Sequence, residues 1–238
     1  MVRYAGWFDV WTDFPAAVRR VAARPEIARV CDLGGGANPI LTLPEIAELC
    51  LRYEIVDVSA QELAKAPAGY ATTRADALDP GFARAHGPYD LIASGFIAEH
   101  VPDPARFHAN VFAALTPGGF AVHAFPTLYE PTFVLNRLMP ERLTGPLLRR
   151  IQGGREDEGS HGKFPAQYRW CRGPTRRQLT RLTALGFEIV EYAGYFGHGY
   201  FGPVKPLDWA EQRLSEWLER HPVPTLTSYA CVVLRRPS

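Results

Sequence analysis

Hydrophobic and polar positions follow two alternating patterns along most of the chain. Short apolar runs, typical of buried strands, are separated by segments in which apolar residues recur at helical spacing. Strands are predicted at residues 28–33, 53–58, 70–76, 89–96, 118–125, 187–196 and 226–236. Helices are predicted at residues 14–23, 43–51, 60–66, 104–115, 175–185 and 209–221. This order predicts an α/β fold with a mainly parallel sheet and helices on both faces.

The alternation stops between residues 126 and 172. Prolines divide this stretch into short pieces, and the polar, glycine-rich run QGGREDEGSHGKF lies near its end. A loop of this length in a compact domain is usually functional or disordered. We expect residues 1–238 to form a single domain, with 126–172 as a substrate-side insertion after the fifth strand, either a lid or a dimer contact. The apolar residues for either purpose are Phe133, Leu135, Leu138, Met139, Leu147 and Leu148.

Three adjacent glycines follow the first predicted strand in the sequence VCDLGGGANPI, residues 30–40. A glycine turn between a parallel strand and the next helix lets a ligand approach the backbone at the carboxyl edge of the sheet. A dinucleotide site would have a third spaced glycine where Pro39 stands, and proline has no N–H to donate to a pyrophosphate. An adenosyl ligand without phosphates fits better, and Asp32 is placed to pair with an ammonium group.

Charge and composition narrow the possible partners. The chain of 238 residues is 47% hydrophobic, and its 26 basic and 25 acidic residues give a formal net charge of +1. Such a chain has no global field that attracts nucleic acid or anionic lipid. No apolar run approaches the roughly 18–20 residues of a membrane span, and the N-terminal residues do not resemble a secretory signal. We therefore expect a cytoplasmic monomer or homodimer with a small-molecule partner and neither nucleic acid nor membrane.

The cysteines predict no metal site. Cys31, Cys50, Cys171 and Cys231 are scattered, without C-x-x-C or paired Cys/His spacing. Cys31 and Cys231 lie in strand-like runs and are interpreted as buried free thiols.

Together these motifs resemble the class I S-adenosylmethionine-dependent methyltransferases of the small-molecule type, over residues 28 to 125. The first motif of that family, an acidic residue followed by glycines at alternate positions, is matched by Asp32, Gly34 and Gly36. Asn38 stands where a further glycine is usual, and asparagine tolerates a left-handed backbone. Asp57, at the end of the second strand, matches the acid that binds both ribose hydroxyls. The segments YDLIASGFIAEHVPDPARF and LTPGG resemble the fourth and fifth strand region.

The resemblance implies a Rossmann-like sheet of seven strands, mainly parallel with the last strand antiparallel, and S-adenosylmethionine as the cofactor. Neither a metal nor a covalent enzyme intermediate is implied. Asp76 matches the acceptor for the adenine amino group, although the same segment offers Asp79 as a plain N-cap. The alternative for Asp32 is a cap of the following turn, and for Asp57 a cap of the helix after it. The expected cofactor-binding residues are Asp32, Gly34, Gly35, Gly36, Asp57, Asp76, Ala77, Ser94 and Gly95, the last two through their backbone.

Two histidines are candidates for the catalytic base. His100 follows the fourth strand and could accept a proton, although it could equally serve loop geometry. His198 lies between glycines in YFGHGYFGP and could face the acceptor, whereas His123 is interpreted as a hydrogen-bonded core residue.

The insertion supplies the candidate substrate-binding residues, which are Thr127, Tyr129, Tyr168 and Trp170. We expect Thr127 and Tyr129 to point at the mouth of the cleft, because they continue the fifth strand. Aromatic residues with arginines fit a flat or anionic small molecule. Alternatively, Arg176, Arg177 and Arg181 form the exposed face of a helix, and Tyr168 and Trp170 form the core of a lid.

The sequence therefore predicts a methyltransferase that acts on a small molecule, with a hydroxyl oxygen as the acceptor atom. No Asn/Asp-Pro-Pro-Tyr/Phe motif for amino-group methylation follows the fourth strand. The Ala, Arg, Gly and Pro content is typical of bacteria with GC-rich DNA, which favours a sugar or secondary metabolite as substrate. The alternatives are nitrogen or carbon as the acceptor atom, another reaction on the same cofactor fold, and a noncatalytic partner subunit.

Overall fold

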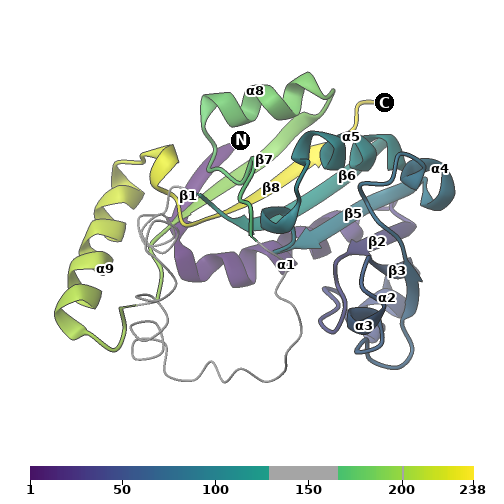
Figure 1. Ribbon diagram of the computed structural model, residues 1–238, viewed down its shortest axis with the longest axis horizontal. Coiled ribbons are helices and arrows are strands. Elements are labelled where there is room, and N and C mark those ends of the chain that lie inside the picture. Colours follow the sequence, from purple (N-terminus) through teal and green to yellow (C-terminus); the bar gives the residue numbers. More distant parts are fainter. Residues whose placement is uncertain (129–165, 200) are drawn as a thin grey trace.

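The computed structural model describes residues 1–128, 166–199 and 201–238, and these residues form one mixed sheet flanked by helices (Figure 1). The eight strands of the described residues are ordered β1-β7-β8-β6-β5-β2-β3-β4. Only β8 is antiparallel to its neighbours β6 and β7; the other pairs are parallel. The strands are β1 (Val2–Gly6), β2 (Arg29–Leu33), β3 (Arg52–Asp57), β4 (Ala71–Arg74), β5 (Tyr89–Gly95), β6 (Leu115–Pro126), β7 (Glu188–Phe196) and β8 (Tyr229–Arg235).

The predicted α/β class, the mainly parallel sheet and the antiparallel last strand are confirmed. All seven predicted strands are present, and β1 is an eighth strand that the hydrophobic pattern did not predict. Its residues are exposed or half-buried, so they lack the continuous apolar run of a central strand. Arg3 fixes β1 through ion pairs of 2.8 Å with Asp13 and 2.7 Å with Glu191.

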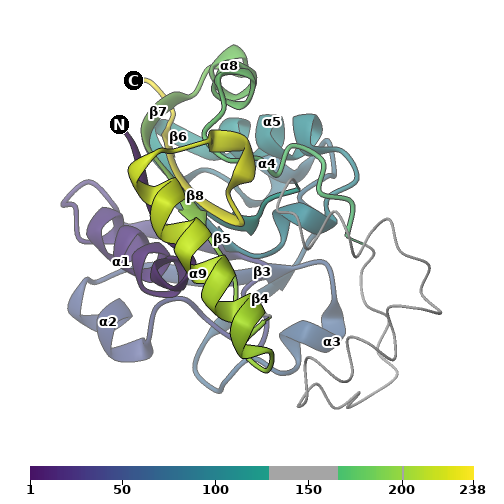
Figure 2. The same cartoon turned by 90° about the vertical axis from the view of Figure 1, so that its left-hand side faces the viewer.

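Helices cover both faces of the sheet (Figures 1 and 2). α1 (Val10–Ala22), α2 (Leu43–Glu48) and α3 (Ala60–Leu63) contribute Val18, Ile46 and Leu63 to the core on one face. α4 (Phe82–His86), α5 (Pro104–Ala114) and α8 (Arg176–Ala184) contribute Phe82, Phe107 and Leu182 to the core on the other. α9 (Lys205–Arg220) contacts β1 and β7 at one end of the sheet. Three short 3₁₀ helices, η1 (Trp7–Asp9), η2 (Ala98–His100) and η3 (Pro224–Leu226), complete the described elements.

Local sequence signals explain where the helices begin and end. Thr42 and Glu45 form a reciprocal capping box at the start of α2, and Asp103 caps α5 directly before Pro104. After α8 the chain turns at Gly186, whose φ of +99° is left-handed, as expected for a helix stop.

The parallel strands β2 to β6 all end at one edge of the sheet, here called the carboxyl edge. β8 runs the other way, so it begins at this edge, with Tyr229 paired to Pro126, the last residue of β6. The edge therefore collects strand ends and loops from the whole chain, and α/β folds bind ligands at such an edge.

Most of the predicted insertion, including Tyr129 and the six apolar residues named above, lies outside the described residues. The described residues on either side of it meet at the carboxyl edge, where Leu128 N donates to Cys171 O at 3.0 Å. Within the described part of the chain, no helix is both long and apolar enough to cross a membrane.

Candidate functional site

The glycine turn after β2 leaves no room for side chains. Gly34 has a φ of +79° and Gly36 a φ of +38°, both in the left-handed region. A Cβ on Gly35 would lie 2.5 Å from the Asp32 carboxylate. Gly34 N donates to Val56 O at 2.7 Å, which ties the turn to β3. The glycines therefore allow a backbone that folds directly over the end of β2.

Asp32 is a buried carboxylate beneath this turn, 1% exposed. Its Oδ2 accepts from Ile40 N at 2.9 Å and from the Tyr53 hydroxyl. Its Oδ1 is buried and has no hydrogen-bond partner. Burial raises the pKa of Asp32 to about 6, although the bonds from Tyr53 and Ile40 oppose this shift. A buried acceptor without a donor is a place for a ligand group such as an ammonium.

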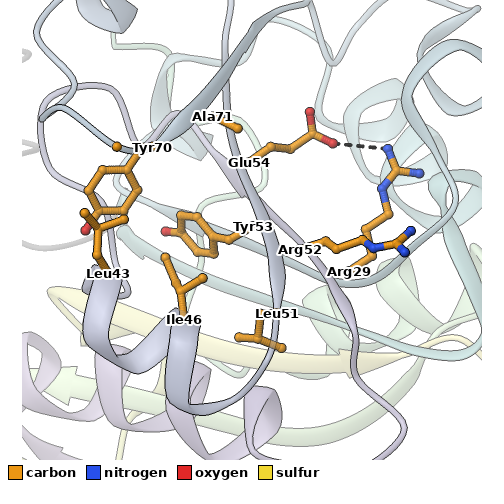
Figure 3. A pocket seen from close by; sticks show the side chains of 10 residues that line it. Arg29, Leu43, Ile46, Leu51, Arg52, Tyr53, Glu54, Tyr70 and Ala71 are labelled. Atoms are coloured by element: carbon orange, nitrogen blue, oxygen red, sulfur yellow. Dashed lines mark hydrogen bonds and ion pairs between the residues drawn. The ribbon is translucent and has the colours of Figure 1, made fainter.

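The hydroxyl of Tyr53 donates to Asp32. Tyr53 also lines a cavity, shown in Figure 3. This cavity of about 420 Å³ is lined on one side by Tyr53, Tyr70, Leu43 and Ile46. Tyr70 donates to Leu41 O at 3.0 Å. Both tyrosines therefore bond the backbone of the loop that follows the glycines, and they fix the position of this loop beside Asp32.

Asp57 lies beside the turn at the end of β3. Its Oδ1 accepts from Ser59 N at 2.8 Å, and its Oδ2 lies 3.7 Å from where a Cβ on Gly36 would be. Burial raises the pKa of Asp57. The carboxylate thus bonds the next turn with one oxygen and faces the glycines with the other, whereas Ser59, not Asp57, is the N-cap of α3. The role of Asp57 toward the ribose hydroxyls stays a prediction.

Asp76 lies farther along the carboxyl edge, after β4. It is exposed, and its Oδ1 accepts from Leu78 N at 2.8 Å, while Asp79 likewise accepts from Gly81 N at 2.7 Å. Asp76 lines a cavity of about 530 Å³ together with Val58, which is 46% exposed. The sequence analysis did not single out Val58. The available signal was an apolar residue, Val58, between the strand-end Asp57 and Ser59, the N-cap of α3.

Ala77, Ser94 and Gly95 complete the predicted cofactor set. The main-chain oxygen of Ala77 accepts from Asn110 Nδ2 at 2.7 Å. The Ser94 hydroxyl is buried and bonded to His123 Nδ1 at 2.7 Å, on the face covered by α5. A Cβ on Gly95 would lie 2.9 Å from Phe14 of α1. Only the backbone of Ser94 and Gly95 is left for a ligand, and His123 is the hydrogen-bonded core residue that was predicted.

The two candidate histidines lie at different places on the carboxyl edge. His100 is in η2, directly after β5, with its Nε2 3.8 Å from Glu99 Oε1. His198 follows β7 and is buried, and its backbone N donates to Glu211 Oε1 at 2.8 Å. β6 and β8 lie between β5 and β7, which separates the strand ends by roughly 14 Å at ~4.8 Å per strand. The structure therefore does not bring His100 and His198 together.

Glu99 is a candidate residue that the sequence analysis passed over in favour of its neighbour. Its carboxyl group is buried, and Oε2 has no hydrogen-bond partner. Burial raises the pKa of Glu99 to about 7. Its main-chain oxygen accepts from Gln167 N at 2.7 Å and Tyr168 N at 3.0 Å. A buried carboxyl that titrates near neutral pH at a strand end is typical of a general acid or base.

Two predicted substrate residues have contacts other than those expected. Thr127 is buried, and its hydroxyl donates to Thr227 O instead of pointing at the mouth of a cleft. The Trp170 indole stacks on His108 of α5, with ring centroids 6.1 Å apart, and under the Arg181 guanidinium of α8 at 5.2 Å. Tyr168 lies beside Glu99 through its backbone bond, with a φ of +51°. The role of these residues toward a substrate stays a prediction.

Comparisons with known proteins identify the family and the fold of the chain. The family described as "Methyltransferase domain" matches residues 9–192. An S-adenosylmethionine-dependent methyltransferase from Mesorhizobium loti has 23% identity and a TM-score of 0.50, with 92% of this chain and 96% of that chain covered. The N-methyltransferase NodS from Bradyrhizobium japonicum, solved with S-adenosylhomocysteine, has 14% identity and a TM-score of 0.55, with 98% and 89% covered. The [4+2]-cyclase SpnF has 16% identity and a TM-score of 0.56, with 98% and 83% covered. The curated proteins contain no match.

The family match spans more than half of the chain, so the protein belongs to the methyltransferase domain family. Its fold is that of the class I enzymes, as the resemblance implied. More particularly, it is an S-adenosylmethionine-dependent methyltransferase.

Proposed function

We propose that the protein transfers the methyl group of S-adenosylmethionine to a hydroxyl oxygen of a small molecule. The observation that carries the cofactor site is the buried, unpartnered Oδ1 of Asp32 beneath a turn that tolerates only glycine. This arrangement fits the ammonium and the amino-acid tail of the cofactor.

The strand order β2-β3-β4 matches the order of the remaining cofactor parts, from the amino-acid tail through the ribose to the adenine. Asp57, beside the turn, would bind the ribose hydroxyls with Oδ2, the oxygen that faces the glycines. Asp76 and Ala77 after β4, with the exposed Val58 nearby, would form the adenine end. The backbone of Ser94 and Gly95 would lie on the other side of the cofactor. When bound, the cofactor supplies an electrophilic methyl carbon whose bond to sulfur breaks, with the electron pair left on sulfur, as the acceptor oxygen attacks.

We assign proton removal to Glu99, with His100 beside it. The Glu99 carboxylate would accept the proton of the acceptor hydroxyl, because a base with a pKa near 7 is half ionised at neutral pH. His100, 3.8 Å from Glu99, would carry that proton toward solvent, since its side chain is 36% exposed. His198 is the alternative on the far side of β8.

The insertion is proposed to lie on the acceptor side as part of a single domain. The described residues support this, because Leu128 and Cys171 pair at the carboxyl edge and residues 167 and 168 bond Glu99. Both ends of the insertion are thus attached next to the proposed base.

Nitrogen is the second candidate for the acceptor atom. Structures with a similar fold include NodS, an N-methyltransferase, and a putative sarcosine dimethylglycine methyltransferase from Galdieria sulphuraria with 15% identity and a TM-score of 0.52. A reaction without methyl transfer, as in the cyclase SpnF, is the further alternative.

The first test is calorimetric titration of the purified protein with S-adenosylmethionine and S-adenosylhomocysteine. We expect micromolar binding that weakens about tenfold, roughly 1.4 kcal/mol, in Asp57→Ala. The matched control is Asp208→Ala on α9, whose carboxylate bonds only Gln212 among the described contacts and should leave binding unchanged. No binding by folded wild-type protein would refute the methyltransferase proposal. Mass-spectrometric screening for a gain of one methyl group on hydroxyl or amine acceptors then decides the atom.

A further inference from the structure

Three aromatic rings from distant parts of the chain meet at the carboxyl edge. Trp11 of α1 stacks on Phe96, the residue after β5, with ring centroids 4.6 Å apart and planes at 24°. Tyr229, at the start of β8, lies 6.1 Å from Trp11 and 6.2 Å from Phe96. We call this group the aromatic platform. None of its members is among the expected cofactor-binding residues.

The backbone at Phe96 is strained in a way that serves this arrangement. Phe96 has a φ of +57°, a left-handed conformation that bulky residues rarely adopt. Its N donates to Ala124 O at 2.8 Å, which fixes the turn. Strained residues of this kind gather at ligand sites, where the surrounding structure holds them in place.

The platform adjoins the cofactor turn. Ile97, the residue after Phe96, packs so closely against Gly34 that a Cβ on this glycine would clash with Ile97 Cγ2. Two residues farther along is Glu99, the proposed base. Phe96 follows the end of β5 and Tyr229 begins β8, so the platform lies on the same carboxyl edge as the glycine turn and Glu99.

The ring spacing excludes a cation held between the platform rings. An aromatic cage holds a cation within about 6 Å of each centroid, so opposed rings stand roughly 8–12 Å apart. The platform rings are only 4.6 to 6.2 Å apart and fill the space between them. Trp11 nevertheless remains 49% exposed although Phe96 covers one face of its indole. The open surface of Trp11 is flat and suited to stacking.

We propose that the methyl acceptor is a planar aromatic molecule that stacks on Trp11 and presents a ring hydroxyl to the site. This inference rests on the proposed function and specifies its substrate class. A phenolic hydroxyl also suits the proposed base, because its pKa near 10 is within reach of a carboxylate that titrates near neutral pH, unlike that of an aliphatic alcohol.

The test uses 2-naphthol as a planar hydroxylated probe and choline as a cationic one. Each is titrated calorimetrically into the full chain saturated with S-adenosylhomocysteine. We expect 2-naphthol to bind and choline not to bind. Trp11→Leu should weaken 2-naphthol binding at least tenfold, whereas Trp11→Phe, which keeps a ring, should weaken it less than threefold. Trp209→Leu is the matched control, because Trp209 lies on α9 and is 63% exposed.

The outcomes separate the inference from the proposed function. If the wild-type protein binds S-adenosylhomocysteine but shows no 2-naphthol binding up to millimolar concentration, the aromatic class is wrong and the cofactor site stands. Equal loss in Trp11→Leu and Trp209→Leu would mean nonspecific adsorption and would also overturn it. Preferred binding of choline would assign the platform to an ammonium acceptor instead. Failure of S-adenosylhomocysteine to bind at all would refute the proposed function itself.

Discussion

The two halves of the carboxyl edge are built in different ways. At the β2–β3–β4 half, each expected cofactor residue comes from a strand end or the turn directly after it. At the β5–β6–β8 half, the platform joins residues 11, 96 and 229, and Glu99 is enclosed by residues 167 and 168. One half is therefore specified by local sequence, and the other by tertiary packing. A cofactor common to many enzymes needs a fixed local motif, whereas the acceptor half is free to vary.

The largest loss of cofactor affinity should come from Gly35→Ala, which tests whether the turn in the β2–β3–β4 half tolerates a side chain. The new Cβ would lie 2.5 Å from the Asp32 carboxylate and would displace it from its bonds to Ile40 and Tyr53. We expect S-adenosylhomocysteine affinity to fall about 100-fold, roughly 2.7 kcal/mol, by calorimetry. Gly202→Ala is the control, because its Cβ would approach only Gly199 O, at 3.5 Å. An unchanged affinity in Gly35→Ala would show that the turn adapts.

A smaller effect is expected from Glu99→Gln, which probes the acceptor half. Because burial raises the pKa of Glu99 to about 7, the folded protein binds this proton more tightly than the unfolded chain. The free energy of unfolding contributed by Glu99 is therefore fully present below pH of about 4 and is lost as the pH rises through 7. Between pH 5 and pH 8 the wild type should lose about 2 kcal/mol more than Glu99→Gln.

Urea denaturation at the two pH values measures this difference, with Glu48→Gln at an exposed site as the control. The same pH dependence in Glu99→Gln and wild type would place the titration on another group. Asp32 is the first group to examine in that case, because burial raises its pKa to about 6.

The smallest effect on the reaction is expected from Trp170→Leu, which locates the boundary of the acceptor half. Since the indole packs on His108 and Arg181, its loss should lower the free energy of unfolding by about 1 kcal/mol and leave the acceptor KM within about threefold. Thermal denaturation and steady-state kinetics give the two values, with Trp209→Leu as the control. A tenfold rise in KM at unchanged stability would support the sequence-based prediction that Trp170 binds substrate.

The accuracy of the sequence interpretation follows the same division. The left-handed turn after Asp32 and the position of Asp57 beside it could be predicted, because the ends of parallel strands β2 and β3 meet at one edge of the sheet. Their role toward the cofactor stays a prediction. β1 was missed because its stability comes from pairing with β7 and from the Arg3 ion pairs, not from an apolar run.

Thr127 shows the limit of strand alternation. Continuing β6 predicted that the Thr127 side chain points at the mouth of a cleft. Instead, β8 runs beside β6, and the Thr127 hydroxyl donates a hydrogen bond to the main-chain oxygen of Thr227, which precedes β8. Glu99 and Trp11 were not found because their significance depends on burial and on partners far away in the chain.

The pairing of β1 with β7 has a consequence for how the enzyme is made. Arg3 and Glu191 are separated by 188 positions, so at about 5–20 residues per second a ribosome needs roughly 10–40 s to deliver the partner strand. β2 to β6 can assemble during that interval together with α1, which packs on β5 and β6, whereas β1 waits for β7 and Tyr229 arrives later still. Nascent chains would thus complete the glycine turn and the end of β5 well before β8 adds Tyr229 to the aromatic platform.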